Sequence, residues 1–199
     1  MEIIKIWNDN ASEKQLQLVS RLMREGELVI IPTDTTYAIA GDALNVKAVE
    51  KLCNLKGINP DKTNLSIICS DISMASEYAK IGNSSFHLLK EYTPGPFTFL
   101  FPAASKLPRA FKGRKIVGVR IPDNKFDIDL ANYMGTPLIT TGIAYETEDY
   151  AVNTDLIAEN YDGKVTLMVA GEEGSTEVST VIDCTGPEPE VIREGKGTL

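Results

Sequence analysis

The sequence predicts an α/β protein in which a twisted, mixed β-sheet is covered by helices. Short apolar runs typical of strands are interleaved with segments whose apolar residues recur at helical spacing. The interleaving lacks a strict β-α-β rhythm, which favours a mixed sheet over a purely parallel one. The chain has 199 residues, of which 43% are hydrophobic and 24% charged. That length buries one sizeable core, so we expect a single domain over residues 1–199.

The first elements are marked by the residues at their ends. Residues 3–7 form an expected opening strand. Ser12 starts a capping-box pattern, and the helix after it is expected to end at Gly26. Residues 28–31 are a continuous apolar run of the buried-strand type, which Pro32 stops.

The remaining elements follow the same signals. After a loop, residues 38–40 are expected to return as a strand, and Asn45 is expected to cap the next helix. Further strands are expected over residues 65–69, 97–101, 116–121, 137–141, 165–170, 179–184 and 190–193. Further helices are expected over residues 72–80, 84–92 and 128–134.

Composition excludes several classes of protein. No apolar run is long enough to span a bilayer, and the N-terminus lacks the layout of a signal peptide, so we expect a cytoplasmic location and no membrane contact. Cys53, Cys69 and Cys184 form no metal or disulfide pattern and are expected to be buried. His87 is the only histidine, which excludes a multi-histidine metal site, and packing or surface exposure is its expected role. We assign no metal ligand and no catalytic residue.

Charge is distributed unevenly along the chain. The net charge of −8 argues against indiscriminate binding of nucleic acid. Residues 105–125, however, contain seven lysines and arginines and a single acid, whereas residues 146–177 contain nine acids and a single lysine. Two interpretations stay open: the basic stretch lines a positive cleft, or both stretches are solvated loops.

The most informative segment is the loop at residues 33–37. It follows a buried strand and carries three threonine hydroxyls, a carboxylate and a phenol. Ligand sites of open α/β folds lie where strands leave the sheet. The alternative is a turn held by local bonds from side chains to the backbone. The residues alone do not decide between the two.

Other candidate site residues are separated from this loop along the chain. Arg120 lies within an apolar strand, where a buried guanidinium requires an internal carboxylate or an anionic ligand, and we favour a ligand. Lys56 can simply complement the end of its helix. Ser179 starts a strand, and Arg193 lies in a glycine-containing ending of the kind that is often disordered.

Taken in order, these segments resemble the YrdC/YciO family over nearly the whole chain. The resemblance is carried by residues 32–37, Lys56 and residues 94–98, 119–122, 179–183 and 193–195. It implies a large, concave, positively charged cavity. It also implies the synthesis of L-threonylcarbamoyladenylate from threonine, bicarbonate and ATP, with Mg²⁺ carried by the nucleotide, in support of threonylcarbamoylation of tRNA adenosine. Such a reaction needs no covalent nucleophile from the protein, which would align the three reactants and neutralise the charges of phosphate and carboxylate groups.

The resemblance also implies roles for individual residues. Those expected to bind the amino-acid substrate are Thr35, Arg120, Thr140 and Ser179, with Arg120 paired to its carboxylate. Those expected to bind the nucleotide are Thr33, Tyr37, Lys56, Lys62 and Arg193.

Two departures place the chain nearer the YciO-type branch. The synthases carry Lys-x-Arg where this chain has Lys56, Gly57 and Ile58, and Ser-Ala-Asn where it has residues 140–144. Three hypotheses follow: a carbamoyladenylate-type enzyme, a protein of the same fold that binds double-stranded RNA or tRNA through its basic stretch, or a paralogue that binds a nucleotide without turnover. The oligomeric state stays open.

Overall fold

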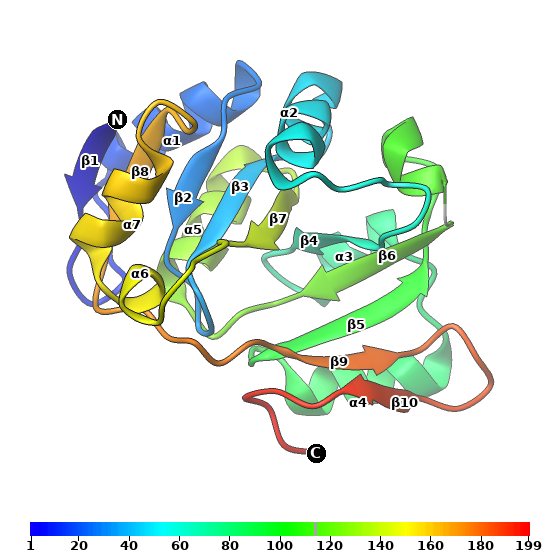
Figure 1. Cartoon of the computed structure of the whole chain (residues 1–199). Coiled ribbons are helices and arrows are strands. Elements are labelled where there is room, and N and C mark those ends of the chain that lie inside the picture. The colour runs from blue at the N-terminus through cyan, green and yellow to red at the C-terminus, as the bar shows by residue number, and fades with distance from the viewer. Residues whose placement is uncertain (114) are drawn as a thin grey trace.

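The computed structural model describes residues 1–113 and 115–199 (Figure 1). Among these residues, ten strands form one sheet in the order β1-β8-β2-β3-β7-β4-β6-β5-β9-β10. The strands are β1 (Glu2–Lys5), β2 (Val29–Ile31), β3 (Ala38–Asp42), β4 (Leu65–Ile68), β5 (Phe97–Pro102), β6 (Ile116–Arg120), β7 (Leu138–Gly142), β8 (Leu167–Ala170), β9 (Thr180–Asp183) and β10 (Glu190–Arg193). The helices are α1 (Glu13–Arg24), α2 (Val46–Lys56), α3 (Ile72–Tyr78), α4 (Asn83–Tyr92), α5 (Lys125–Met134), α6 (Asp149–Val152), α7 (Thr154–Tyr161) and the short 3₁₀ helix η1 (Arg109–Lys112).

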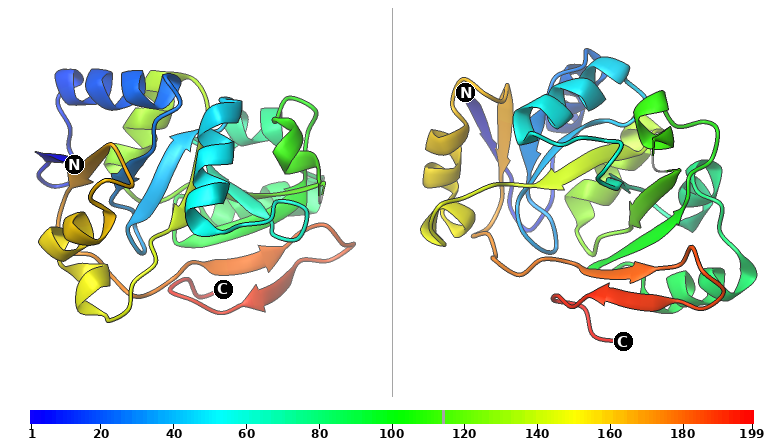
Figure 2. Two further views of the ribbon diagram at one scale, coloured as in Figure 1. Left: turned by 45° about the horizontal axis from the view of Figure 1, so that its top comes forward. Right: turned by 45° about the vertical axis from the view of Figure 1, so that its right-hand side comes forward.

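The predicted fold class is confirmed, because the sheet is mixed. The pairs β1–β8, β8–β2, β4–β6 and β5–β9 are parallel, and the other neighbouring pairs are antiparallel. The N-terminus lies beside β1 at one edge, and the C-terminus lies beside β10 at the other (Figure 2). In the middle of the sheet, β7 from the second half of the chain lies between β3 and β4 from the first half.

The helix ends predicted from the sequence are formed as expected. The Ser12 hydroxyl accepts a bond from the Gln15 amide, and the Gln15 side chain accepts one from the Ser12 amide, which completes the capping box. Asn45 caps α2, which ends at Gly57 in the left-handed conformation. Gly26, with φ +89°, follows the end of α1. These local signals are sufficient to position α1 and α2.

Several boundaries differ from the prediction. The first strand ends at Lys5 because a turn with positive φ at Asn8 and Asp9 follows, and Trp7 is 76% exposed. Helix α5 begins three residues earlier than expected because Asn124 caps it. Helices α6 and α7 were not predicted. They lie in the acidic stretch, where few apolar residues mark the buried face of a helix.

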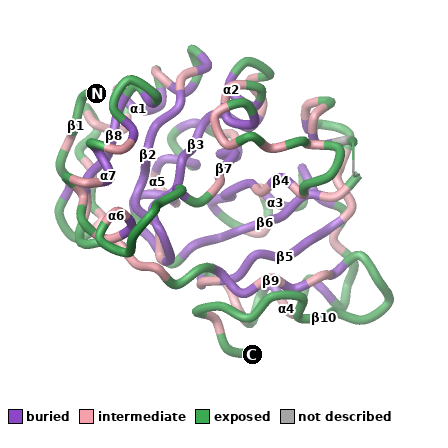
Figure 3. The backbone as a smooth tube through the Cα atoms, in the orientation of Figure 1, coloured by how far each residue is buried: buried purple, intermediate pink, exposed green. Residues whose placement is uncertain are grey.

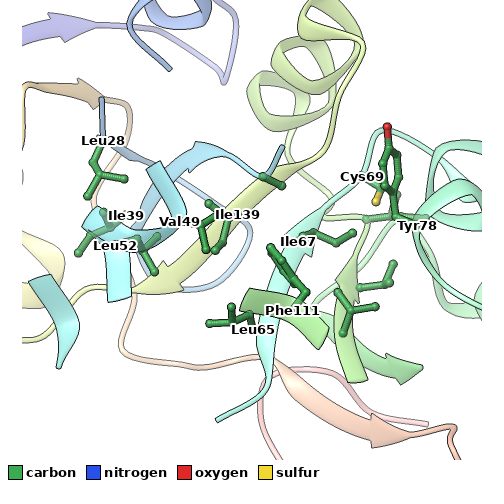
Figure 4. Packing of buried hydrophobic residues seen from close by; sticks show 14 of the residues in the cluster. Leu28, Ile39, Val49, Leu52, Leu65, Ile67, Cys69, Tyr78, Phe111 and Ile139 are labelled. Atoms are coloured by element: carbon green, nitrogen blue, oxygen red, sulfur yellow. The ribbon is translucent and has the colours of Figure 1, made fainter. Parts of the chain in front are cut away.

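Helices pack against both faces of β3, whose alternate residues point in opposite directions. Ile39 belongs to a core cluster that includes Val49 and Leu52 of α2 (Figure 4). Ala38 and Ala40 belong to a second cluster with residues of α1 and α5. The central strands are therefore buried along most of their length, whereas β10 is exposed (Figure 3).

A row of small residues crosses the centre of the sheet. Ala40 lies opposite Thr140, Thr140 opposite Ser66, and Ser66 opposite Gly118. The neighbouring residues of these strands alternate to the other face, where large apolar side chains such as Phe99 pack in the core. Ala40, at one end of this row, is covered by α1 and α5, whereas the small side chains of Ser66 and Thr140 leave room above them.

Gly118 is expected to be required for this arrangement. A Cβ atom at Gly118 would lie 2.5 Å from the Ser66 hydroxyl oxygen and 3.1 Å from Cγ2 of Thr98. We expect Gly118→Val to lower the free energy of unfolding by about 1–3 kcal/mol, because overpacking displaces these neighbours. Urea denaturation measures the change.

Gly186→Val is the matched control. The nearest atom to a Cβ at Gly186 is 3.8 Å away, and the residue is exposed, so the expected change is below about 0.5 kcal/mol. Equal losses of stability in the two variants would contradict the packing argument.

Candidate functional site

A pocket of about 400 Å³ includes Ser66 and Thr140, from the row of small residues, in its lining. Its walls come from two connections, the loop after β2 and the segment between α2 and β4. Helix α2 and the strands β3, β4, β5, β6, β7, β9 and β10 contribute most of the other lining residues. Hydroxyl, amide and guanidinium groups share the lining with aliphatic side chains. The lining residues are Thr35, Thr36, Ala38, Leu52, Ile58, Thr63, Asn64, Leu65, Ser66, Thr98, Leu100, Arg120, Thr140, Thr141, Gly142, Val178, Ser179, Val181, Ile192 and Arg193.

Arg120, the last residue of β6, is held by an internal acid. Its Nη2 donates to Asp34 Oδ1 at 2.7 Å and to Thr35 Oγ1 at 3.0 Å. The second carboxylate oxygen of Asp34 accepts the Asp123 amide at 2.9 Å. We favoured a ligand as the anionic partner of Arg120, and for this contact that prediction is wrong. The partner is an internal carboxylate, that of Asp34, as the alternative interpretation had it. Arg120 nevertheless lines the pocket, and its buried Nε has no partner among the described residues.

The loop at residues 33–37 divides its side chains between two tasks. Thr33 Oγ1 accepts the Thr35 amide at 3.0 Å and donates to the Thr36 carbonyl at 2.7 Å, which closes a local turn. Thr35 is thereby directed toward Arg120 and into the pocket. Tyr37 is buried elsewhere, where its hydroxyl donates to the Glu172 carbonyl and accepts the Gly171 amide. Burial raises the pKa of Tyr37 to about 12.

Ser179 and Arg193 form the wall of the pocket beside Thr98 of β5. The hydroxyls of Ser179 and Thr98 lie 2.7 Å apart. The Arg193 guanidinium donates twice to the Ser179 carbonyl, at 3.1 and 2.7 Å, and once to its hydroxyl, at 3.1 Å. Burial, together with the positive charge of Arg120, lowers the pKa of Arg193. The two guanidinium groups are therefore close enough to repel each other.

The residues after β10 pack against this wall, contrary to the expectation of a disordered ending. The Gly195 amide donates to the Thr180 hydroxyl at 3.0 Å, and the same hydroxyl donates to the Gly197 carbonyl at 2.6 Å. A Cβ at Gly197 would lie 2.5 Å from the Phe97 ring, so only glycine permits this approach. Lys196 Nζ donates to the Asp34 carbonyl at 2.7 Å, across the site.

The structure brings together some of the predicted site residues and separates others. Those that line the pocket are Thr35, Arg120, Thr140, Ser179 and Arg193. Lys56 lies at the rim, where its ammonium donates to the Gly142 carbonyl at 2.7 Å and burial lowers its pKa. Thr33, Tyr37 and Lys62 are not among the lining residues.

The lining is cationic and polar rather than acidic. Among the described residues, none of the side chains that line the pocket is an aspartate or a glutamate. The described part of the chain contains no group of three or more histidine, cysteine, aspartate or glutamate residues arranged to hold a metal ion. The arrangement is therefore suited to carboxylate and phosphate groups.

The basic stretch does not form one continuous positive surface. Lys106 pairs with Glu77, and Lys125 pairs with Asp129. Arg120 is buried against Asp34. Arg114 lies outside the described residues. Three of the seven cations are therefore paired with an acid, and among the described residues of this stretch Arg120 is the one cation that lines the pocket.

Outside the pocket, the predictions for the cysteines and for His87 are confirmed. The three cysteines are free and buried, and burial raises the pKa of the Cys184 thiol to about 11. His87 is exposed on α4, beside the Phe86 ring. Within the described part of the chain, every helix is too short or too polar to span a bilayer.

Sequence reasoning missed three contributors to the pocket. Thr98 and Ser66 interrupt apolar strand runs, and strand alternation could have assigned both to the polar face. Asn64 precedes β4 and had no recognisable sequence signal. Its Oδ1 atom is buried and has no hydrogen-bond partner among the described residues.

Comparisons with known proteins agree on one family. The model of the Sua5, YciO and YrdC proteins, described as "Telomere recombination", matches residues 21–195. Escherichia coli YciO is 29% identical over 194 residues, which are 96% of this chain and 94% of YciO. A protein of Pyrococcus abyssi named threonylcarbamoyl-AMP synthase is 28% identical over 98% of this chain, but the match covers 58% of that protein.

Solved structures give the same relationship. The crystal structure of E. coli YciO superposes with a TM-score of 0.91 and 29% identity, covering 100% of this chain and 98% of that one. P. abyssi Sua5 complexed with L-threonine superposes with a TM-score of 0.86 and 27% identity, covering 98% of this chain and 58% of that one.

The Arg120–Asp34 pair is expected to dominate the stability of the site. The two side chains are 10% and 7% exposed, so removing one charge leaves the other buried without a counter-charge. We expect Asp34→Asn to lower the free energy of unfolding by about 3–5 kcal/mol in urea denaturation. Asp129→Asn, which breaks the exposed pair with Lys125, should cost less than about 1 kcal/mol. Comparable losses would refute the buried-pair assignment.

Asp127 of α5 is expected to make stability depend on pH. It is fully buried, and neither carboxylate oxygen has a partner among the described residues. Burial raises its pKa well above the ordinary value, although the nearby charge of Arg120 opposes the shift. Between the unfolded and the folded pKa the folded state binds more protons, so stability falls as pH rises.

The Asp127→Asn variant removes this titration. From about pH 4 upward, its free energy of unfolding should rise relative to wild type by up to about 1.4 kcal/mol per pH unit, until the pH passes the folded pKa. Urea denaturation between pH 4 and pH 8 measures the difference. A constant difference over this range would show that Asp127 is ionised in the folded protein.

Proposed function

We propose, because the chain belongs to the Sua5/YciO/YrdC family, that it forms threonylcarbamoyladenylate from threonine, bicarbonate and ATP. The observation that carries the proposal is the convergence of Arg120 of β6 and Arg193 of β10 on one hydroxyl-lined pocket. The relatives named threonylcarbamoyl-AMP synthase and the threonine complex of Sua5 support the same substrate class. The product would serve threonylcarbamoylation of tRNA adenosine.

Threonine is assigned to the end of the pocket at Arg120. Nη2 of Arg120 is engaged by Asp34 and Thr35, whereas its buried Nε has no partner among the described residues. A substrate carboxylate at Nε would satisfy this donor and complete the neutralisation of the charge. The hydroxyls of Thr35 and Ser179 line the same pocket, and Thr140 contributes a third hydroxyl from β7.

The phosphates of ATP are assigned to Arg193 and Lys56. Both are cations at or beside the pocket, and burial lowers the pKa of each. Phosphate oxygens would stabilise the two charged forms and relieve the repulsion between Arg193 and Arg120. Thr33 and Tyr37 are assigned to shaping the loop, since their hydroxyls are bonded within the protein.

The reaction would proceed by alignment and charge stabilisation. The threonine nitrogen forms a bond to the bicarbonate carbon, and water leaves, which gives a carbamate. A carbamate oxygen then attacks the α-phosphorus of ATP, and the bond to the bridging oxygen breaks to release pyrophosphate. Fixed guanidinium groups stabilise the charge that develops on the transferred phosphorus. Because no acid lines the pocket among the described residues, a magnesium ion would be held by the phosphates rather than by the protein.

Arg193 provides the test of this assignment. We expect wild-type protein with threonine, bicarbonate, Mg²⁺ and ATP to release pyrophosphate and form a new adenylate, and omission of threonine to abolish the reaction. Arg193→Ala should lower the rate by about 100-fold or more, because a donor to the transferring group is lost. Arg193→Lys, which keeps the charge, should recover part of the rate.

The control is Arg21→Ala, which removes an exposed arginine of α1 outside the pocket and should leave the rate unchanged. Threonine-independent pyrophosphate release, or no adenylate product from folded wild-type protein, would refute the proposed reaction. Salt-sensitive binding of duplex RNA without any adenylate would instead favour a binding protein of this fold.

A further inference from the structure

An uncompensated acceptor lies in the pocket wall at Asn64. This residue directly precedes β4 and lines the pocket. Its Oδ1 atom is buried without a partner among the described residues. A buried acceptor without a donor costs about 1–3 kcal/mol, and water or a ligand must supply the missing bond. The atom therefore marks a position where a ligand N–H or O–H group would be stabilised.

Asn64 lies at the end of the pocket away from Arg120. Leu65, which follows Asn64, is opposite Val117 on β6, and Arg120 ends that strand three residues later. At about 3.3 Å per residue, the backbone of Asn64 is separated from that of Arg120 by about 13 Å along the sheet. In Figure 1 the connection from α2 to β4 passes β6 on the side away from β9 and β10. The guanidinium groups and Asn64 therefore define two ends of one elongated site.

The chemistry of the Asn64 end differs from that of the cationic end. Leu52 and Ile58, from the end of α2 and the connection after it, line the pocket together with Leu65. Aliphatic walls suit a flat, apolar ring rather than a phosphate. Phosphate oxygens at neutral pH are acceptors, so they cannot satisfy Oδ1 of Asn64. The ligand group at this end must combine a planar apolar face with an N–H donor on its edge.

We propose that Asn64 recognises the base of the nucleotide and selects adenine, an inference that rests on the proposed function. Adenine presents its 6-amino donor beside the N7 acceptor, and an asparagine amide pairs with both groups at once. Guanine and hypoxanthine carry a carbonyl oxygen at position 6, which would face Oδ1 with a second acceptor. The distance to Arg120 then leaves room for the ribose and phosphates between the base and the cationic end.

A comparison of ATP with ITP tests this assignment, because ITP carries a carbonyl oxygen in place of the 6-amino group. Isothermal titration calorimetry of wild-type protein should show about 5- to 150-fold tighter binding of ATP. Asn64→Leu should abolish the preference while still binding ITP. Asn64→Asp keeps an acceptor oxygen in place and should retain a preference for ATP. Asn132→Leu, an exposed asparagine of α5, is the matched control and should behave as wild type.

Each outcome separates the two proposals. Equal affinity of wild-type protein for ATP and ITP, or an unchanged preference in Asn64→Leu, would overturn the assignment of Asn64 and leave the proposed reaction standing. Binding of neither nucleotide by folded wild-type protein would overturn both. Circular dichroism establishes that each variant is folded, and Asn64→Asp gives a second reading if Asn64→Leu is unfolded.

Discussion

The ion pair between Arg120 and Asp34 is the contact on which the site depends. It joins the end of β6 to the loop after β2, two segments 86 residues apart in the sequence. Moving two charges out of water is unfavourable unless each is paired and further hydrogen-bonded. Asp34 meets this condition through the Asp123 amide, and Arg120 meets it in part through Thr35. The same bonds that satisfy the pair therefore hold a hydroxyl and a cation at the edge of the pocket.

The pocket itself depends on an asymmetry between the two faces of the central strands. On one face, side chains such as Phe99 and Val119 are buried in the core and fix the positions of β5 and β6. On the other face, Ser66 and Thr140 line the pocket and are too small to fill it, and the absence of a side chain at Gly118 makes room for the Ser66 hydroxyl. The packed face keeps β5 and β6 rigid, and the small side chains on the other face leave space for a ligand. The strands that line the pocket therefore do not have to reorganise when a ligand binds.

The sequence was sufficient for the features that depend on local patterns. Helix caps such as Ser12 and the apolar strand runs predicted the mixed α/β architecture, and the energetic cost of a buried guanidinium predicted that Arg120 needs an anionic partner. The identity of that partner depends on the tertiary fold, because Asp34 lies in the loop after β2, and β3, β7 and β4 separate β2 from β6 in the sheet. The direction of each side chain in the loop after β2 was also beyond local reasoning, which is why Tyr37 was expected in the pocket and is buried elsewhere. Gly197 was attributed to a disordered ending because a close approach to the Phe97 ring leaves no local signal.

The second cation of the site is provided by the least buried strand of the sheet. Strand β10 is exposed along its length and pairs with β9 at the edge of the sheet, yet Arg193 at its end reaches Ser179 and lies near Arg120. Both guanidinium groups line the pocket, so an anion bound between them would offset the repulsion of their charges. Under the proposed function, phosphate binding and the docking of β10 therefore stabilise each other, because a ligand that binds only the docked arrangement shifts the equilibrium toward it. The contact of Gly195 with Thr180 of β9 and that of Lys196 with the Asp34 carbonyl limit the freedom of β10 before any ligand arrives. Less of the binding free energy is therefore consumed in ordering this part of the chain.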